Sequence, residues 1–176
     1  DEPLDAFARR VVEDMGEQVR SAADLGSSVH AAIEVYLQTG ESPENPDILR
    51  LFAPVKLWID EHVERIGLVE TVAVHSEFGF AGRIDLVAKL KSTGTWAVID
   101  FKTQKMKPDK KGVYQASYYE TWPLQLMAYF KALNSAGECS RRLEDIASVV
   151  INSVEPTPVQ VKVWPRVDSV VSESYK

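Results

Sequence analysis

Hydrophobic residues change their spacing near Gly67, and this change sets the class of fold that the chain can form. Before Gly67 they recur every three or four residues, which is the spacing of one face of an α-helix. After Gly67 they alternate with other residues, as Val72, Val74 and Phe78 do, which is typical of a β-strand. The first third of the chain is therefore predicted to be helical, and strands are predicted to follow.

The predicted elements come in the order three helices, three strands, one helix and two strands. This order predicts an α/β fold in which a mixed central β-sheet is flanked by helices. The 176 residues fit a single domain, 1–176, better than two. The long gap at 104–120 is typical of a functional loop. Helices are expected over 4–20, 22–38, 47–66 and 123–136, and strands over 72–78, 80–90, 95–103, 146–154 and 159–164.

The composition excludes two classes of protein. Hydrophobic residues make up 45% of the chain and charged residues 26%, an ordinary globular balance that excludes wholesale disorder. The longest unbroken apolar run is Leu126 to Phe130, far short of the ~18 residues that a membrane-spanning helix needs. We therefore expect no membrane association.

The single cysteine, Cys139, limits the redox environment and the metal chemistry of the chain. It cannot form an intrachain disulfide, which favours a reducing, intracellular compartment, and the cytoplasm is expected. It also excludes a four-cysteine zinc or iron–sulfur site built from this chain alone. The sequence starts at Asp1 rather than at methionine, so a trimmed N-terminus is expected and a removed organelle-targeting segment stays an alternative.

The net charge of −6 argues against nucleic-acid binding until it is divided along the chain. Residues 102–111 carry five basic and one acidic residue, whereas residues 1–66 carry six basic and fourteen acidic residues. A polyanion responds to the local field near a site and not to the total charge. Aromatic residues suited to stacking on unpaired bases follow the basic segment: Tyr114, Tyr118, Tyr119 and Trp122. The alternative is a lysine-rich loop that is merely soluble.

An acid and a lysine emerge side by side from the strand predicted at 95–103. Alternation places Asp100 and Lys102 on one face of that strand, and on their own they would form a weak surface ion pair worth ~0–1 kcal/mol. Asp85 lies on the preceding strand, and positions 85 and 100 are equidistant from the centre of the intervening turn. A register close to that symmetry brings the two carboxylates together, whereas a one-residue slip would separate them.

Two close carboxylates repel each other, and a shared proton or a bound cation is the usual remedy. Lys102 could instead neutralise one of them. Two helices carry polar residues that could face this hairpin. His30 lies one turn after Gly26, whose missing side chain permits close approach, and Gln125-x-x-x-Tyr129 spans one turn of the helix predicted at 123–136. Taken alone, each of these residues is ordinary packing or solvent-exposed surface.

Four ordered motifs together resemble a known family: Gly26-Ser-Ser-Val-His30, Gly82-Arg-Ile-Asp85, Asp100-Phe-Lys102 and Gln125-x-x-x-Tyr129. Their order and spacing resemble the PD-(D/E)XK nuclease superfamily, and within it the RecB-like exonuclease branch that includes CRISPR adaptation and mitochondrial DNA-end nucleases. The resemblance covers about 26–131, and the order of elements extends it to a motif-bearing core of about 22–164. It implies the restriction-endonuclease-like fold of that superfamily.

The resemblance also implies roles for the matching residues. Asp85, Asp100 and Lys102 would be catalytic, with Lys102 orienting the attacking water or stabilising the developing charge. His30, Asp85, Asp100 and the backbone carbonyl of Phe101 would bind Mg²⁺ or Mn²⁺, hard cations that suit oxygen ligands. Some members of the branch hold an iron–sulfur cluster with four cysteines, and this chain is expected to lack one.

The same resemblance places DNA along one side of the site. Gln125 and Tyr129 would border the DNA path. Independently of the resemblance, the positive charge of residues 102–111 predicts that four lysines after the catalytic strand, here termed the loop lysines, bind the DNA backbone: Lys105, Lys107, Lys110 and Lys111. Glu77 is a weaker candidate for an auxiliary acid, whereas His62 and His75 are expected to be surface or packing residues.

The sequence therefore predicts a metal-dependent DNA exonuclease that acts at or near DNA ends, favours single-stranded DNA and has little sequence specificity. Nothing in the chain resembles an element that reads base edges. DNA repair and recombination are the processes that the branch implies. The alternatives are a non-catalytic nucleic-acid-binding module of the same fold within a larger DNA-processing complex, a structure-dependent endonuclease, and a metal-binding enzyme or interaction domain unrelated to nucleic acid.

Overall fold

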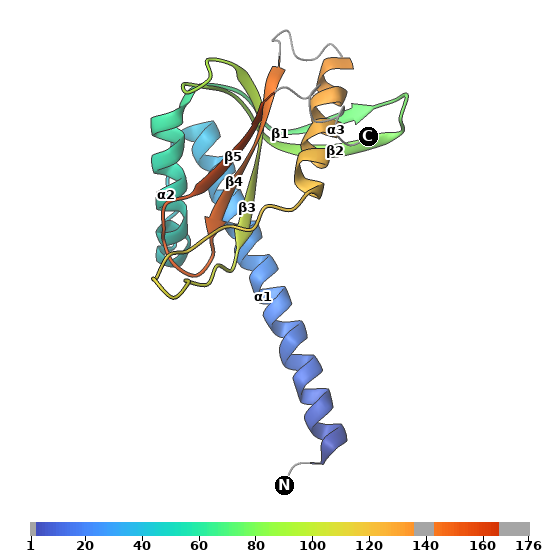
Figure 1. The fold of residues 1–176 in the computed structure, drawn as a ribbon, viewed down its shortest axis with the longest axis vertical. Coiled ribbons are helices and arrows are strands. Elements are labelled where there is room, and N and C mark those ends of the chain that lie inside the picture. The colour runs from blue at the N-terminus through green and yellow to red at the C-terminus, as the bar shows by residue number, and fades with distance from the viewer. Residues whose placement is uncertain (1–2, 136–142, 166–176) are drawn as a thin grey trace.

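A computed structural model describes residues 3–135 and 143–165, and these form one twisted sheet with helices on both faces (Figure 1). The sheet has five described strands in the spatial order β1-β2-β3-β4-β5. Neighbouring strands are antiparallel except β3 and β4, which are parallel, so the predicted mixed sheet is confirmed. The elements are α1 (Leu4–Thr39), α2 (Pro46–His62), β1 (Val63–His75), β2 (Phe80–Leu90), β3 (Trp96–Gln104), α3 (Thr121–Ser135), β4 (Leu143–Asn152) and β5 (Gln160–Pro165).

The two predicted N-terminal helices are one continuous helix, α1, of 36 residues. Neither Gly16 nor Gly26 interrupts it, because an isolated glycine costs a helix only about 1 kcal/mol. The predicted stop at Gly40 is confirmed: this glycine takes a left-handed conformation with φ 79°, and its N–H bonds to the carbonyl oxygen of Tyr36 at 2.9 Å.

The boundary between α2 and β1 was predicted wrongly. The helix ends at His62 rather than at Ile66, and β1 begins at Val63, nine residues before the strand that alternation predicts. This early part of β1 pairs with β2 but contains two register shifts, between Val63 and Arg65 and between Ile66 and Leu68. Each shift breaks the strict alternation of faces, so the local pattern does not indicate a strand.

The predicted register of the β2–β3 hairpin is confirmed. Leu86 pairs with Ile99 and Lys89 with Trp96, so paired positions are equidistant from the turn, as the symmetry argument requires. The pairing ends at Leu86 and Ile99, whereas β2 continues to pair with β1 as far as Phe80. The two strands therefore separate at the level of Asp85 and Asp100.

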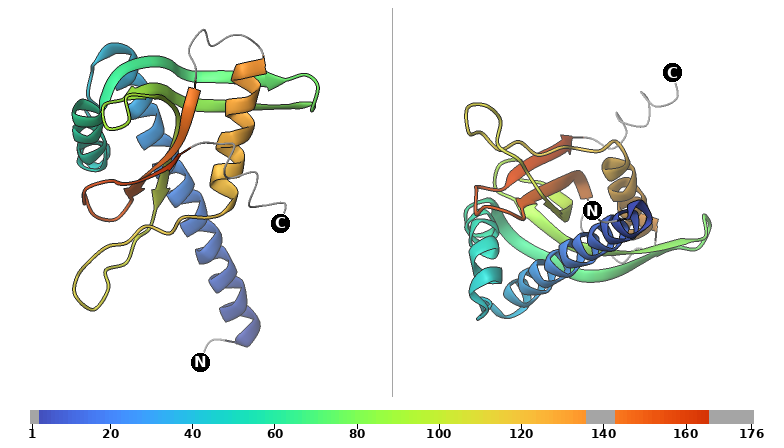
Figure 2. Two further views of the ribbon diagram at one scale, coloured as in Figure 1. Left: turned by 45° about the horizontal axis from the view of Figure 1, so that its top comes forward. Right: turned by 90° about the horizontal axis from the view of Figure 1, so that it is seen from below.

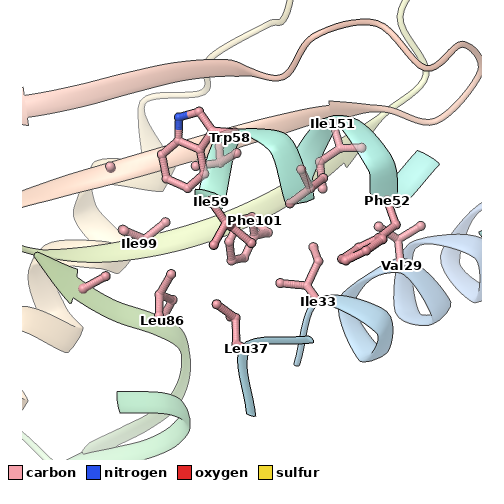
Figure 3. Close-up of a cluster of buried hydrophobic side chains, with 14 of the residues drawn as sticks. Val29, Ile33, Leu37, Phe52, Trp58, Ile59, Leu86, Ile99, Phe101 and Ile151 are labelled. Carbon is pink, nitrogen blue, oxygen red and sulfur yellow. The ribbon is translucent and has the colours of Figure 1, made fainter. Parts of the chain in front are cut away.

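Two hydrophobic clusters hold the layers together. One joins α1 and α2 to a sheet face that includes Ala97, Ile99 and Phe101, and Figure 3 shows Phe101 among side chains from both helices. The other joins α3 to the opposite face, which includes Val98. Figure 2 shows the same division of the helices between the two faces. The predicted alternation along β3 is thus confirmed, and it leaves Asp100 and Lys102 on the α3 side.

The loop between β3 and α3 is attached to the sheet by two glutamine side chains. Gln104 bonds both backbone polar groups of Ser117, at 2.7 and 3.0 Å. Gln160 on β5 accepts a hydrogen bond from the N–H of Ala116 at 2.9 Å and donates to the carbonyl of Tyr114 at 2.8 Å. The segment that returns towards α3 is therefore fixed in position.

The predictions about membrane helices and about Cys139 can be compared with the described residues only. Among the helices in the described ranges, none is both long enough and apolar enough to cross a membrane. Cys139 lies outside the described residues, and the predictions that rest on it are not tested.

Candidate active site

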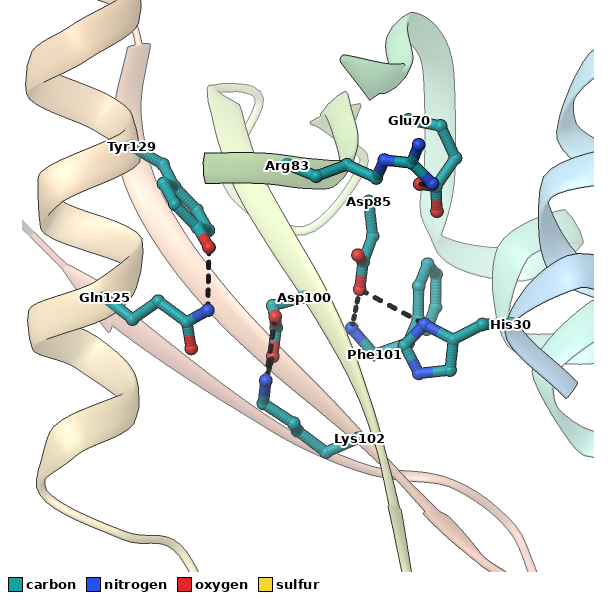
Figure 4. Close-up of polar contacts among 9 residues, drawn as sticks. All are labelled: His30, Glu70, Arg83, Asp85, Asp100, Phe101, Lys102, Gln125 and Tyr129. Atoms are coloured by element: carbon teal, nitrogen blue, oxygen red, sulfur yellow. Dashed lines mark hydrogen bonds and ion pairs between the residues drawn. The ribbon is translucent and has the colours of Figure 1, made fainter. Parts of the chain in front are cut away.

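The separation of β2 from β3 creates the setting for Asp85. Its carboxylate oxygen Oδ2 accepts a hydrogen bond from the backbone N–H of Phe101 on β3 at 2.8 Å. The side chain of Asp85 is 14% exposed. The Asp85 side chain, which comes from β2, therefore lies against the edge of β3 just beyond the last β2–β3 pair. Figure 4 shows it near Asp100, which comes from β3.

Asp100 and Lys102 form a close ion pair on the α3 side of the same strand. Lys102 Nζ donates to Asp100 Oδ1 at 3.0 Å and lies 2.8 Å from Oδ2. The Asp100 side chain is only 9% exposed, and its buried Oδ2 atom has the ion pair with Lys102 but no hydrogen bond. Both oxygens of this buried carboxylate thus lie within 3.0 Å of the Lys102 ammonium.

His30 reaches the site from α1. At Gly26, one turn earlier, a Cβ atom would lie 2.8 Å from Thr103 Oγ1, so only glycine lets the helix pack this closely against the end of β3. His30 Nδ1 lies 3.7 Å from Asp85 Oδ2, and the imidazole ring meets the Phe101 ring edge-on at 6.5 Å. The predicted close approach at Gly26 is confirmed, and it brings the histidine to the two acids.

Burial and mutual repulsion shift the pKa values of these groups. Burial, followed by the negative charge of Asp100, raises the pKa of Asp85 to about 6, although the Phe101 N–H acts in the opposite direction. Burial also raises the pKa of Asp100, against the effect of Lys102. The pKa of His30 is lowered by burial, although the charges of Asp100 and Glu70 oppose this. Each shift favours the neutral form of the group. Keeping Asp85 and Asp100 ionised therefore costs free energy, and a bound cation would reduce that cost.

Glu70 is a member of this cluster that the sequence did not reveal. The β1–β2 register on either side of it places Glu70 opposite Asp85, and it takes a positive φ of 46° inside the strand. Its side chain is 13% exposed and pairs with Arg83 at 3.4 Å, and its pKa is raised by burial and then by the charge of Asp85. The sequence around Glu70 does not alternate clearly, so this part of β1 was not predicted as a strand and Glu70 was not considered. Glu77, the predicted auxiliary acid, lies exposed in the β1–β2 turn instead.

Gln125 and Tyr129 face the site from α3, on the side where Asp100 and Lys102 lie (Figure 4). Gln125 Nε2 donates to the Tyr129 hydroxyl at 2.7 Å. The Tyr129 ring fills the space above Gly82, where a Cβ atom would lie only 2.2 Å from the ring carbon Cε1. The glycine of the Gly82-Arg-Ile-Asp85 motif thus makes room for the tyrosine of the Gln-Tyr motif.

Trp122, one of the aromatic residues after the basic segment, reaches the site, whereas the loop that carries the loop lysines extends away from α3. Tyr119 and Trp122 contact each other edge-on at 5.3 Å, and Lys102 Nζ lies 5.9 Å from the centre of the Trp122 ring. The loop lysines are all exposed, on a loop whose tip points away from α3 in every view (Figures 1 and 2).

The two remaining histidines are packing residues, as predicted. His62 stacks on Trp58 with ring centres 5.8 Å apart, and His75 is buried between Phe78 and Phe80.

The donor set fits a hard divalent cation in kind. It contains two carboxylates and an imidazole, with the backbone of Phe101 beside them, and carboxylate and carbonyl oxygens are the ligands that hard divalent cations prefer. Within residues 3–135 and 143–165, no three acidic, histidine or cysteine side chains are already grouped as a metal site. Binding would therefore require small side-chain movements, such as release of Asp100 from Lys102.

A family model and a solved structure resemble this chain. The family model described as the PD-(D/E)XK nuclease superfamily matches residues 3–168. Among curated proteins, none matches the chain. A crystal structure titled "Putative exonuclease" from Eubacterium rectale shares 11% identity with a TM-score of 0.47, over 86% of this chain and 62% of its own. The chain thus spans less than two thirds of that protein.

Proposed function

Because the chain belongs to the PD-(D/E)XK nuclease superfamily, we propose that it is a metal-dependent deoxyribonuclease of the RecB-like type. It hydrolyses phosphodiester bonds at or near DNA ends, favours single-stranded DNA and has little sequence specificity. The observation that carries this proposal is the meeting of Asp85, Asp100 and Lys102 where β2 separates from β3. DNA repair or recombination would be its setting.

The residues at the point where β2 and β3 separate would have different roles in hydrolysis. His30, Asp85, Asp100 and the backbone carbonyl of Phe101 would hold Mg²⁺ or Mn²⁺, which supplies positive charge at the phosphoryl oxygens and an acidified water. Asp85 stays aligned through its bond to the Phe101 N–H, and the close packing at Gly26 holds the helix that carries His30. No iron–sulfur cluster is part of this proposal.

Lys102 supplies the positive charge that this chain itself brings to the reaction. Asp100 holds its ammonium within 3.0 Å, and the ammonium also lies against the face of Trp122. A lysine fixed in this way can orient an attacking water and stabilise charge on a phosphoryl oxygen in the transition state. The ion pair holds the Lys102 side chain in position before the substrate binds.

The surroundings of the site favour unpaired DNA. Trp122, Tyr119, Gln125 and Tyr129 offer stacking faces and polar groups beside Lys102, whereas base-edge readers for a duplex groove are not evident in the described residues. Stacking surfaces bind any base, which supports low sequence specificity. The loop lysines would hold the backbone further along the strand.

A cleavage assay tests the proposal. End-labelled linear single-stranded DNA is incubated with the protein, with Mn²⁺ or with EDTA. Cleavage should require the metal, and Asp100→Asn and Lys102→Ala should each reduce turnover at least about 10²-fold. Lys56→Ala, on the far side of the sheet, is the matched control and should retain activity. Near-full turnover by a folded Lys102→Ala variant would contradict the mechanism, and binding without cleavage in Mn²⁺ would favour a non-catalytic module.

A second substrate pair tests the preference for ends. Linear and covalently closed circular single-stranded DNA of the same sequence differ only in their termini. The linear form should be degraded much faster, and equal rates on both would identify an endonuclease instead.

A further inference from the structure

A row of polar residues crosses the α3 face of the sheet from the proposed catalytic strand to its edge. Asp100 on β3 is the register partner of Ser148 on β4, and Ser148 is the register partner of Lys162 on β5. Paired residues point to the same side of a sheet, and neighbouring strands lie ≈ 4.8 Å apart. Lys162 therefore lies on the face of Asp100, about 10 Å away across two strands.

The neighbours of Lys162 along β5 confirm that its side chain lies on the α3 face of the sheet. Val161 and Val163, which alternate with Lys162 on β5, pack against the cluster under α1 and α2. Trp164, two residues after Lys162, packs against the α3 cluster instead. Lys162 therefore opens towards the same space as Lys102 and Trp122.

Aromatic rings hold the ammonium of Lys162 in place. Its Nζ lies 3.7 Å from the centre of the Trp164 ring and 5.4 Å from that of Tyr118. Tyr118 in turn contacts Trp122 at 6.2 Å, so the aromatic surface continues from Lys162 to Lys102. Among the described residues no carboxylate forms an ion pair with Lys162, unlike Lys102 with its partner Asp100. Its charge is available to an anion.

Two buried hydrogen-bonding atoms beside Lys162 have no partner in the described protein. Ser148 is fully buried, yet its Oγ makes no hydrogen bond, and the indole Nε1 of Trp164 is also buried without one. Buried polar atoms are normally paired with protein, ordered water or a ligand. Both can donate a hydrogen bond, so this part of the sheet contains buried donors beside Lys162 that the described protein does not use.

The position of Tyr118 does not depend on a flexible loop. Gln160, two residues before Lys162 on the same strand, binds the backbone of Tyr114 and Ala116. The segment that carries Tyr118 is therefore attached to β5 itself. Lys162 and Trp164 lie on β5, and Tyr118 lies on the segment that Gln160 attaches to β5.

We propose that Lys162, with Tyr118 and Trp164, forms a second phosphate-binding subsite for the substrate strand. This inference rests on the proposed nuclease function and adds a binding residue that lies outside the four motifs. A separation of about 10 Å corresponds to at most three nucleotides of a strand with a rise of 3.4 Å per nucleotide. Lys162 would hold a phosphate within that distance of the bond that is cut, and the rings would take the adjoining bases.

The test uses the full chain and a fluorescein-labelled single-stranded oligothymidylate, in EDTA, so that binding is measured without cleavage. Lys162→Met removes the charge but keeps an unbranched apolar stem against Trp164. Its slope of log K against log salt should be shallower by about 0.7, and its affinity at 50 mM salt about tenfold weaker, as expected for one lost phosphate contact. Lys162→Arg should restore the slope. Lys56→Met, on the opposite face of the molecule, is the matched control and should bind as the wild type does.

Cleavage kinetics in Mn²⁺ separate binding from chemistry: Lys162→Met should raise KM about tenfold and change kcat by less than about twofold. If Lys162→Met lowers the melting temperature, Lys162→Gln gives a second neutral variant for the same comparison. An unchanged slope and KM, in a protein that still binds and cleaves DNA, would overturn the subsite and leave the nuclease function intact. Failure of the wild type to bind the oligonucleotide would overturn both.

Discussion

Asp85→Asn is expected to make the protein more stable while it abolishes activity. The carboxylate of Asp85 is buried next to Asp100, and its pKa is raised from 3.8 to about 6. Asparagine keeps an oxygen that can accept the hydrogen bond from Phe101 and removes the charge. A difference of about two pKa units at 1.36 kcal/mol each corresponds to about 3 kcal/mol, so the free energy of unfolding should rise by up to about 3 kcal/mol above pH 7 without divalent cations.

The sign of the effect fixes its dependence on pH. Because the pKa of Asp85 is higher in the folded protein than in the unfolded chain, the folded state binds the proton more tightly. The contribution of this group to stability is complete below about pH 4 and is lost as the pH rises through about 6. The advantage of Asp85→Asn should therefore be absent at pH 4 and reach its full size near pH 7.

Urea unfolding followed by circular dichroism, in EDTA at several pH values from 4 to 8, measures this difference. Asp60→Asn is the control, because hydrogen bonds from Lys56 and Tyr36 lower the pKa of that exposed carboxyl and its removal should bring no gain. A variant Asp85→Asn that is less stable than the wild type at pH 8 would refute the reasoning. It would mean that the carboxylate stabilises the fold as well as the chemistry.

Three further outcomes are expected. His30→Ala should require at least about tenfold more Mn²⁺ for the same rise in melting temperature, and an unchanged Mn²⁺ requirement would exclude a direct ligand. Replacing all four loop lysines with alanine should reduce the salt slope of single-stranded DNA binding by up to about 2.8, whereas an unaltered slope would mean that the loop does not contact DNA. Gly82→Ala should destabilise the fold by roughly 1–3 kcal/mol in urea unfolding, because its Cβ would overlap the Tyr129 ring; wild-type stability would show that the ring moves aside freely.

Features that depend on short-range sequence signals were predictable. The turn between β2 and β3 is short, so its symmetry fixed the pairing that brings Asp85 level with Asp100. Strict alternation along β3 likewise fixed which side chains enter which cluster. Gly26 could be recognised as a point of close approach, because a glycine permits close packing whichever residue lies opposite it.

Features that depend on long-range pairing were not predictable. The start of β1 has register shifts that hide its alternation, so neither the true end of α2 nor the position of Glu70 could be seen. Lys162 alternates with valines in a correctly predicted strand, but its closeness to the site depends on the parallel pairing of β3 with β4. The loop lysines follow Lys102 in sequence, and the loop between β3 and α3 extends away from α3 (Figure 1). A loop can leave a strand in any direction, so the sequence alone does not define how far the loop lies from the site.

The attachment of the loop through Gln104 and Gln160 has a consequence for the thermodynamics of DNA binding. Fixing the backbone of a disordered residue costs about 1–2 kcal/mol in conformational entropy. Here the segment around Tyr114 and Ser117 is already fixed in the free protein, so DNA does not have to order it. The stretch that carries the loop lysines is thus anchored at both ends, at Gln104 and at Tyr114. A change in loop length would therefore change where the DNA strand is bound relative to where it is cut, with little effect on the affinity for DNA.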